Sequence, residues 1–131
     1  MIVRNITTMP FFMKLLAMYG MFAPSLAIVS IFDAYSAEGW SWGAIFVFIS
    51  FGIVPALIFF AGAMCMVLKK RFSRPLYISG MFLTSSVAGI HPGVIPSDEW
   101  VTLVAFNAVI VLALGLYLWF NSKALQYFHE K

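Results

Sequence analysis

The sequence predicts an all-α integral membrane protein, an antiparallel up-down bundle of four transmembrane helices with both termini in the cytoplasm. Its 131 residues are 63% hydrophobic and only 10% charged, whereas about 25% of residues are charged in ordinary soluble domains. The apolar residues form charge-free blocks near the length of about 20 residues that a bilayer requires. Basic and acidic residues lie in alternate loops. We therefore expect residues 1–131 to form a single transmembrane helical domain.

The blocks predict helices over about residues 15–32, 43–68, 75–90 and 101–120. They lack the strict apolar/polar alternation of barrel strands, so helices satisfy the backbone better. Short connections predict that consecutive helices are antiparallel neighbours. The third helix is the shortest. Residues 121–131 either continue the fourth helix or turn onto the membrane surface.

Charge asymmetry predicts the orientation. The basic residues lie at both ends and in the loop between the second and third helices: Arg4, Lys14, Lys69, Lys70, Arg71, Arg74, Lys123 and Lys131. The other two loops hold Asp33, Glu38, Asp98 and Glu99. By the positive-inside rule, the basic side is cytoplasmic. A bacterial inner membrane is the expected location.

The basic loop "KKRFSR" contains Lys69, Lys70, Arg71 and Arg74. Because this cluster is short and adjoins the membrane, we expect it to contact anionic lipid headgroups of the bilayer. Nucleic acid is not an expected partner.

Small polar residues form a possible layer inside the bundle. Counted inward from the outer helix ends, five residues fall at similar depth: Ser25, Ser50, Ser85, Ser86 and Asn107. One interpretation is a small cavity that binds a ligand and opens to the outside. The other is hydrogen bonding between packed helices, which is common in membrane bundles.

The stretch "AGIHPGVIPSDEW" holds His91 near the outer end of the third helix. Pro92 stops that helix, and Ser97 is a suitable N-cap for the next, with Asp98 and Glu99 in its first turn. The simplest expectation for His91 is a solvated interfacial side chain. The alternative is an outer-face metal or proton-sensing cluster with acidic residues, namely Asp33, Glu38, Asp98 and Glu99.

Aromatic side chains are expected at both membrane boundaries, among them Trp100 on the outer side and Tyr77 on the inner side. The chain has no dinucleotide fingerprint, P-loop or zinc-ligand spacing, so no cofactor or metal is predicted. It has one cysteine, Cys65, and therefore no internal disulfide.

Three functions fit this pattern. The first is a small non-enzymatic membrane protein that binds a membrane-associated protein, as an accessory subunit, regulator or immunity-type protein. The second is an oligomeric transporter or channel for a small neutral or weakly polar solute, lined by the polar layer. The third is an interfacial enzyme acting on lipid or quinone, with His91 and Asp33 or Asp98 as acid and base.

Overall fold

The computed structural model describes residues 1–91, 96 and 98–129, and every regular element in this part is helical. In chain order the elements are α1 (Ile2–Thr8), α2 (Phe11–Glu38), α3 (Trp42–Val47), the π-helix η1 (Phe48–Ile53), α4 (Val54–Val67), α5 (Ser73–Ser86), the 3-10 helix η2 (Val87–Ile90), α6 (Trp100–Phe120) and α7 (Ser122–His129). Pro92, Ser97 and Lys131, to which the sequence assigned a helix stop, a cap and a basic charge, lie outside the described residues.

Three helical segments are long and apolar enough to cross a membrane: Phe11–Glu38, Trp42–Val67 and Trp100–Phe120. This confirms the all-helical fold and supports the membrane assignment, whereas the fourth crossing and the orientation stay predictions. The remaining predicted span, residues 75–90, forms α5 followed by η2 and is not among these three. A 3-10 helix rises about 2.0 Å per residue instead of 1.5 Å, so η2 lengthens this short segment.

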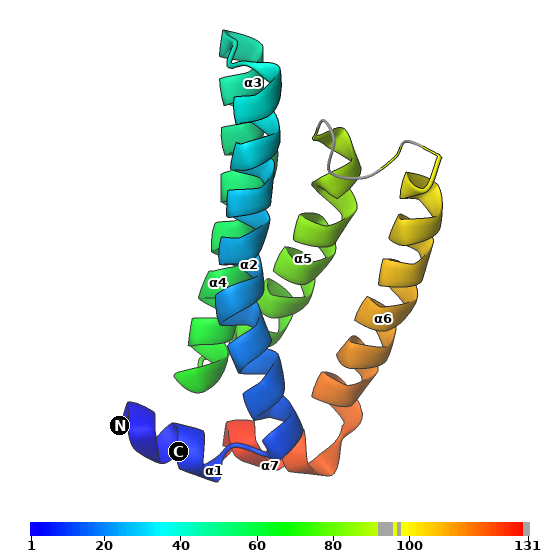
Figure 1. Cartoon of the computed structure of the whole chain (residues 1–131). Coiled ribbons are helices and arrows are strands. Elements are labelled where there is room, and N and C mark those ends of the chain that lie inside the picture. Colours follow the sequence, from blue (N-terminus) through cyan, green and yellow to red (C-terminus); the bar gives the residue numbers. More distant parts are fainter. Residues whose placement is uncertain (92–95, 97, 130–131) are drawn as a thin grey trace.

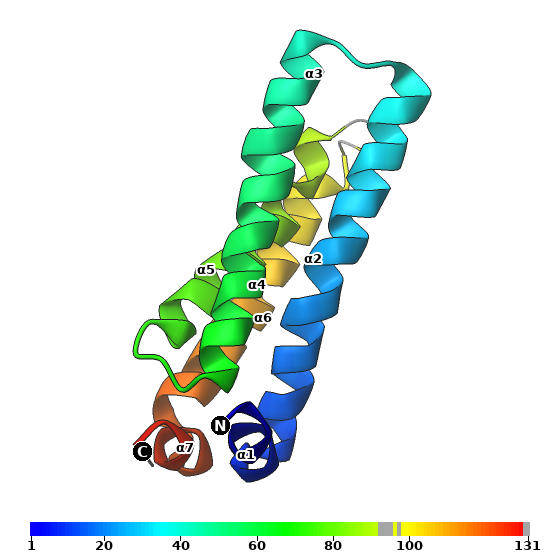
Figure 2. The same cartoon turned by 90° about the vertical axis from the view of Figure 1, so that its left-hand side faces the viewer.

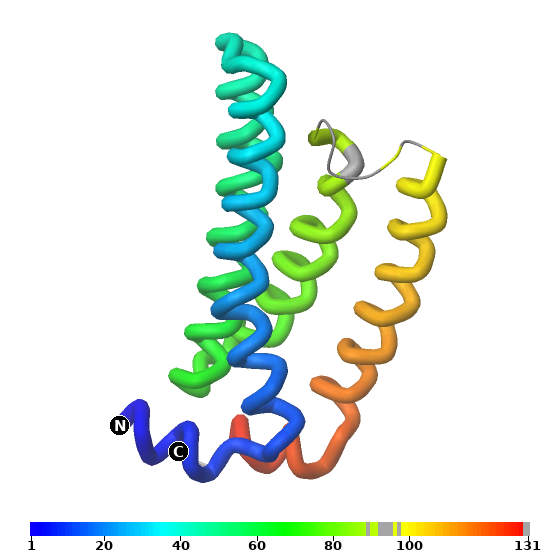
Figure 3. Tube along the Cα trace, viewed as in Figure 1, coloured from blue at the N-terminus to red at the C-terminus, as the bar shows by residue number. Residues whose placement is uncertain are grey.

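The helices form a bundle in which α4 lies beside both α2 and α5, and α6 runs beside α5 (Figure 1). α2 packs on α4, α4 on α5, and α5 on α6. Figure 2 shows α1 and α7 next to each other at one end, which we call the termini end. The trace in Figure 3 shows α6 running beside α5 before α7 turns back beneath the bundle.

The first long helix, α2, is longer than the predicted 15–32 because charged residues at its ends remain helical. It starts directly after Pro10, whose φ of −54° suits a helix entry. It ends at Gly39, whose φ of 98° is a conformation that favours glycine. Asp33 and Glu38 are therefore on the last turns of α2 rather than in a loop.

The bounds of the fourth predicted helix, 101–120, agree with those of α6 to within one residue. α6 begins at Trp100, and Asp98 and Glu99 lie just before it, so they are not in its first turn as predicted. Its start is held by the indole of Trp100, whose Nε1 donates to the carbonyl oxygen of Ser86 at 2.7 Å. Its end contacts α2 through Phe12 and Tyr117, whose rings meet edge-on with centroids 4.8 Å apart.

The close contact between α4 and α5 depends on two glycines. A Cβ at Gly62 would overlap the backbone of Tyr77, and a Cβ at Gly80 would overlap the backbone of Phe59. Small residues permit such close approach between membrane helices. Tyr77, which the sequence placed in the interfacial belt, is instead fully buried, and its hydroxyl donates to the carbonyl oxygen of Leu16 at 2.7 Å.

The main hydrophobic core lies toward the termini end, where α2, α4 and α5 meet α7. α7 is a separate helix and does not continue α6. The backbone of Asn121 is extended, with ψ of 125°, and its side-chain oxygen accepts from the amides of Lys123 and Ala124 at 3.0 and 3.3 Å. This is an N-cap, and it turns α7 so that Ala124 and Tyr127 are buried against the bundle.

Candidate functional site

His91 is buried, with 2% of its surface exposed, which corrects the expectation of a solvated histidine. It lies between the end of α2 and the π-helix η1. The hydroxyl of Tyr35 is 3.2 Å from its Nδ1, and the carbonyl oxygen of Phe51 is 3.4 Å from its Nε2. The rings of Tyr35 and His91 also meet edge-on, with centroids 5.7 Å apart.

Pro55 removes the α-helical donor of the Phe51 carbonyl. In an α-helix the amide of residue i+4 donates to carbonyl i, and proline has no N–H to give. The chain forms π-type bonds here, with the amide of Val54 donating to the carbonyl of Ile49. Such π-segments inside a helix often occur at functional sites. The Nε2 of His91 thus contacts a carbonyl to which Pro55 cannot donate.

These contacts indicate which tautomer the neutral ring of His91 adopts. A carbonyl oxygen only accepts, so Nε2 carries the proton, and Nδ1 of the neutral ring accepts from the hydroxyl of Tyr35. Burial lowers the pKa of His91 from its ordinary value of 6.5, and the bond to the Phe51 carbonyl opposes this in part. The site therefore favours a neutral imidazole.

The described contacts of His91 are with Tyr35 and Phe51 and include none of the predicted acidic residues, although Glu38 interacts electrostatically with Tyr35. Asp33, Glu38, Asp98 and Glu99 are all exposed, and the described residues contain no group of three or more His, Cys, Asp or Glu that could hold a metal ion. Because both ring nitrogens of His91 are already in contact with Tyr35 and Phe51, the geometry does not favour an acid–base pair with Asp33 or Asp98.

The residues of the predicted polar layer do not share one environment. Ser25 is exposed on α2, and Ser50 is half-buried in η1. Ser85 donates to the carbonyl of Met81 within its own helix at 2.8 Å. Ser86 and Asn107 are placed in the facing helices α5 and α6, which pack together.

Four buried polar atoms on these two helices have no hydrogen-bond partner among the described residues: Ser73 Oγ at the start of α5, and Thr84 Oγ1, Ser86 Oγ and Asn107 Nδ2 toward the other end of the pair. Buried polar atoms are normally paired, and an unpaired one requires an explanation such as a water or a ligand. The α5/α6 contact is therefore the part of the predicted layer that retains unmet hydrogen-bonding capacity.

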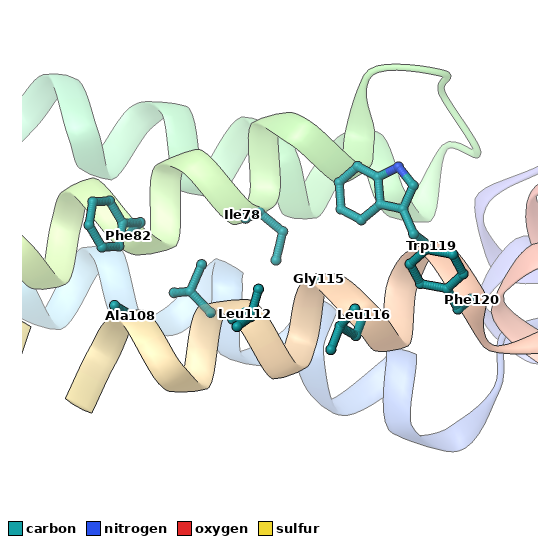
Figure 4. A pocket seen from close by; sticks show the side chains of 9 residues that line it. Ile78, Phe82, Ala108, Leu112, Gly115, Leu116, Trp119 and Phe120 are labelled. Carbon is teal, nitrogen blue, oxygen red and sulfur yellow. The ribbon is translucent and has the colours of Figure 1, made fainter. Parts of the chain in front are cut away.

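A groove of about 360 Å³ runs along the same helix pair nearer the termini end. Ile78 and Phe82 of α5 line one side, and side chains of α6 line the other (Figure 4). Gly115 lies in this groove, and a Cβ added there would have no neighbour within 4 Å. Only Asn107 and Leu118 of α6 are buried, so most of this helix faces outward.

The predicted headgroup residues Lys69, Lys70, Arg71 and Arg74 surround one hollow at the termini end. Phe128 and His129 of α7 complete its lining. Sequence reasoning did not assign these α7 residues because their position depends on the turn at Asn121. Sequence reasoning also missed Tyr35. The nearest signal in the sequence is Pro55, which removes the α-helical donor of the Phe51 carbonyl.

No protein-family model, curated protein or solved structure matches this chain.

Proposed function

We propose that the protein is a small non-enzymatic membrane protein that binds another membrane protein within the bilayer. The proposed topology is four membrane crossings, with α5 and η2 as the third, and both termini in the cytoplasm of a bacterial-type inner membrane. The positive-inside rule supports this orientation, because Lys69, Lys70 and Arg71 lie on the same side as the ends of the chain.

The orientation has a direct test in a Cys65→Ser background. Ser36 and Ser122 are both exposed, and they lie at opposite ends of the bundle. A membrane-impermeant maleimide should label Ser36→Cys in intact cells, and should label Ser122→Cys only after permeabilisation. The reverse pattern would overturn the orientation.

The observation that carries the function is the open notch at Gly115 in the α5/α6 groove. Membrane helices associate through small residues that let backbones approach closely. Gly62 and Gly80 already serve this purpose inside the chain, whereas a Cβ added at Gly115 would meet no atom of another part of the chain within 4 Å. We infer that a transmembrane helix of a partner protein lies against α6 at this position.

Site-specific photo-crosslinking tests this proposal. A photoreactive residue replaces Leu112, which lines the groove, or Leu26 on α2, and the two side chains are matched at 66% and 68% exposed. The expected result is one defined protein adduct from position 112 and only lipid adducts from position 26. Gly115→Leu, which fills the notch, should abolish the adduct formed at Leu112.

Equal adducts at both positions, or insensitivity to Gly115→Leu, would contradict the groove as a docking site. An adduct between two copies of this chain would instead favour an oligomer. That result would shift support to the second candidate function.

The second candidate is an oligomeric transporter or channel for a small neutral or weakly polar solute. The unpaired buried atoms of Thr84, Ser86 and Asn107 favour it. If the cavity contains water, the cysteine of Asn107→Cys in a Cys65→Ser background should react with a small hydrophilic thiol reagent. Leu118→Cys is the matched control, because Leu118 is the other buried residue of α6. If both cysteines are equally protected from the reagent, the α5/α6 contact contains no water, and the support for this function is lost.

A further inference from the structure

We propose that the hollow between the α4–α5 turn and α7 is a binding site for a phosphate group, the anionic group of membrane lipid heads. The hollow has a volume of about 280 Å³. Its lining comes from two parts of the chain that are far apart in sequence: Lys69, Lys70, Arg71, Arg74, Phe128 and His129. This site is separate from the α5/α6 groove, so it is independent of the proposed protein partner.

The turn that carries the basic residues has a defined geometry. Lys69 has a φ of 55°, the left-handed conformation that glycine usually takes after a helix. Its amide donates to the carbonyl of Met66 at 3.2 Å, and the amide of Lys70 donates to the carbonyl of Cys65 at 2.9 Å. This is a Schellman motif, and it reverses the chain sharply. The basic side chains are thereby placed on a fixed turn rather than on a loose loop.

The helix dipoles favour an anion beside Arg71 and Arg74. Lys69 and Lys70 follow the C-terminus of α4, where the helix dipole favours positive charge. Arg71 and Arg74, however, lie at the N-terminus of α5, where the dipole disfavours positive charge, and the first turn of α5 has no acidic residue. A phosphate between these residues would relieve their mutual repulsion and complement the N-terminus of α5 at the same time.

Helix α7 orients two of the basic groups. The guanidinium of Arg74 stacks on the ring of Phe128 at 4.4 Å from the centroid, and the ammonium of Lys69 lies 4.5 Å from the centroid of Tyr127. A stacked guanidinium keeps its N–H groups in its own plane, where they can donate in pairs to phosphate oxygens. The site therefore requires α7 to be packed on the bundle.

The position of the hollow favours a lipid over a soluble anion as the source of the phosphate. Phe72, the residue after Arg71, is 66% exposed, and a large apolar side chain in this position suits the membrane interface. A phosphate at headgroup depth is present in every anionic phospholipid. Free phosphate offers the same chemistry from the aqueous side, so the test includes both.

The test uses the full chain in a nonionic detergent. Native mass spectrometry measures retention of phosphatidylglycerol and, separately, of phosphatidylcholine. A third arm measures the rise in Tm with inorganic phosphate against chloride at equal ionic strength. Arg71→Gln removes an exposed charge from the hollow, and Lys123→Gln removes an exposed charge from α7 outside this lining.

The expected result is saturable retention of phosphatidylglycerol over phosphatidylcholine, weakened about five-fold by Arg71→Gln and unchanged by Lys123→Gln, as about 1 kcal/mol per basic residue implies. Stabilisation by inorganic phosphate that Arg71→Gln removes, without preference for the anionic lipid, would support the site with phosphate from solution. Equal losses in the two variants would show general charge attraction and overturn the site. Absence of saturable binding in every arm would overturn it as well.

Discussion

The hydroxyl oxygen of Tyr35 lies 3.2 Å from Nδ1 of His91, and this contact joins segments 56 residues apart in sequence. Tyr35 is on the last turns of α2, and His91 directly follows η2. The contact lies far from the main hydrophobic core, which is at the opposite end of the bundle. It is therefore a principal restraint on how the end of the α5–η2 segment sits against α2.

Replacing Tyr35 with phenylalanine should destabilise the protein by about 1–3 kcal/mol. The ring remains, but the buried Nδ1 of His91 loses its hydrogen-bond partner, and an unpaired buried polar atom costs about this much. Tyr19→Phe is the control, because Tyr19 is exposed and should change stability little. Tryptophan fluorescence during thermal unfolding in detergent measures both. Equal stability losses would mean that the contact with His91 contributes nothing.

Acid should weaken the folded state through His91. Burial lowers its pKa in the folded protein below the ordinary value of 6.5. Above that value the ring is neutral in both states and its contribution is complete. Below it, the unfolded chain binds the proton more readily, so stability is lost as the pH falls toward the folded pKa.

The matched variant for this prediction is His91→Gln, which keeps polar groups but does not titrate. The Tm of the wild type should fall more than that of His91→Gln between about pH 7.5 and about pH 5, the range in which histidine changes charge. The exposed carboxylates are common to both proteins, so the difference reports His91. Parallel Tm curves would contradict a lowered pKa.

Hydropathy could predict the membrane-crossing segments because length and apolar content are properties of each segment alone. It could not predict the neighbours of His91. The helices are apolar on nearly every face, so no stripe of hydrophobic residues indicates which side of α2 faces η1. The pairing of Tyr35 with His91 depends on the packing of complete helices, and that information is not local.

Local chemistry was informative where a residue changes the backbone itself. Pro55 leaves the carbonyl of Phe51 without its α-helical donor, and a contact of that oxygen with another donor could have been expected. The turn at Asn121 is similar, because asparagine is a favoured N-cap residue. By contrast, the left-handed conformation of Lys69 has no signal in the sequence, since glycine is the usual residue at that place.

The glycines of the α4–α5 contact provide a third prediction. Gly62→Ala and Gly80→Ala should each destabilise the protein by about 1–3 kcal/mol or more, because the added methyl group meets backbone atoms that cannot turn aside. Gly115→Ala adds the same methyl group to a helix where nothing lies within 4 Å. It should not destabilise the isolated protein, and it should stabilise it by up to about 1 kcal/mol, because alanine favours a helix interior more than glycine does. Denaturant titration in mixed micelles measures the series, and three similar values would contradict the close approach of α4 to α5.

The last four carbonyl oxygens of α4 all accept hydrogen bonds. The first three accept from backbone amides of the turn: Met64 from Leu68, Cys65 from Lys70, and Met66 from Lys69. The fourth, Val67, accepts from Asn5 Nδ2 at 3.0 Å. It also accepts from the hydroxyl of Tyr127, which is shared between the carbonyls of Met66 and Val67 at 3.2 and 3.3 Å. Helices α1 and α7 thus share one acceptor.

This sharing predicts that substitutions of Asn5 and Tyr127 are not additive. Burial raises the pKa of Tyr127 to about 12, so its hydroxyl remains a donor at any working pH. In Asn5→Ala or Tyr127→Phe alone, the Val67 carbonyl keeps one donor, and each loss should be near the usual net value of about 1 kcal/mol. The double variant leaves that oxygen without a side-chain donor. Its loss should exceed the sum of the single losses by at least about 0.5 kcal/mol in a double-mutant cycle, whereas strict additivity would show that α1 and α7 hold the end of α4 independently.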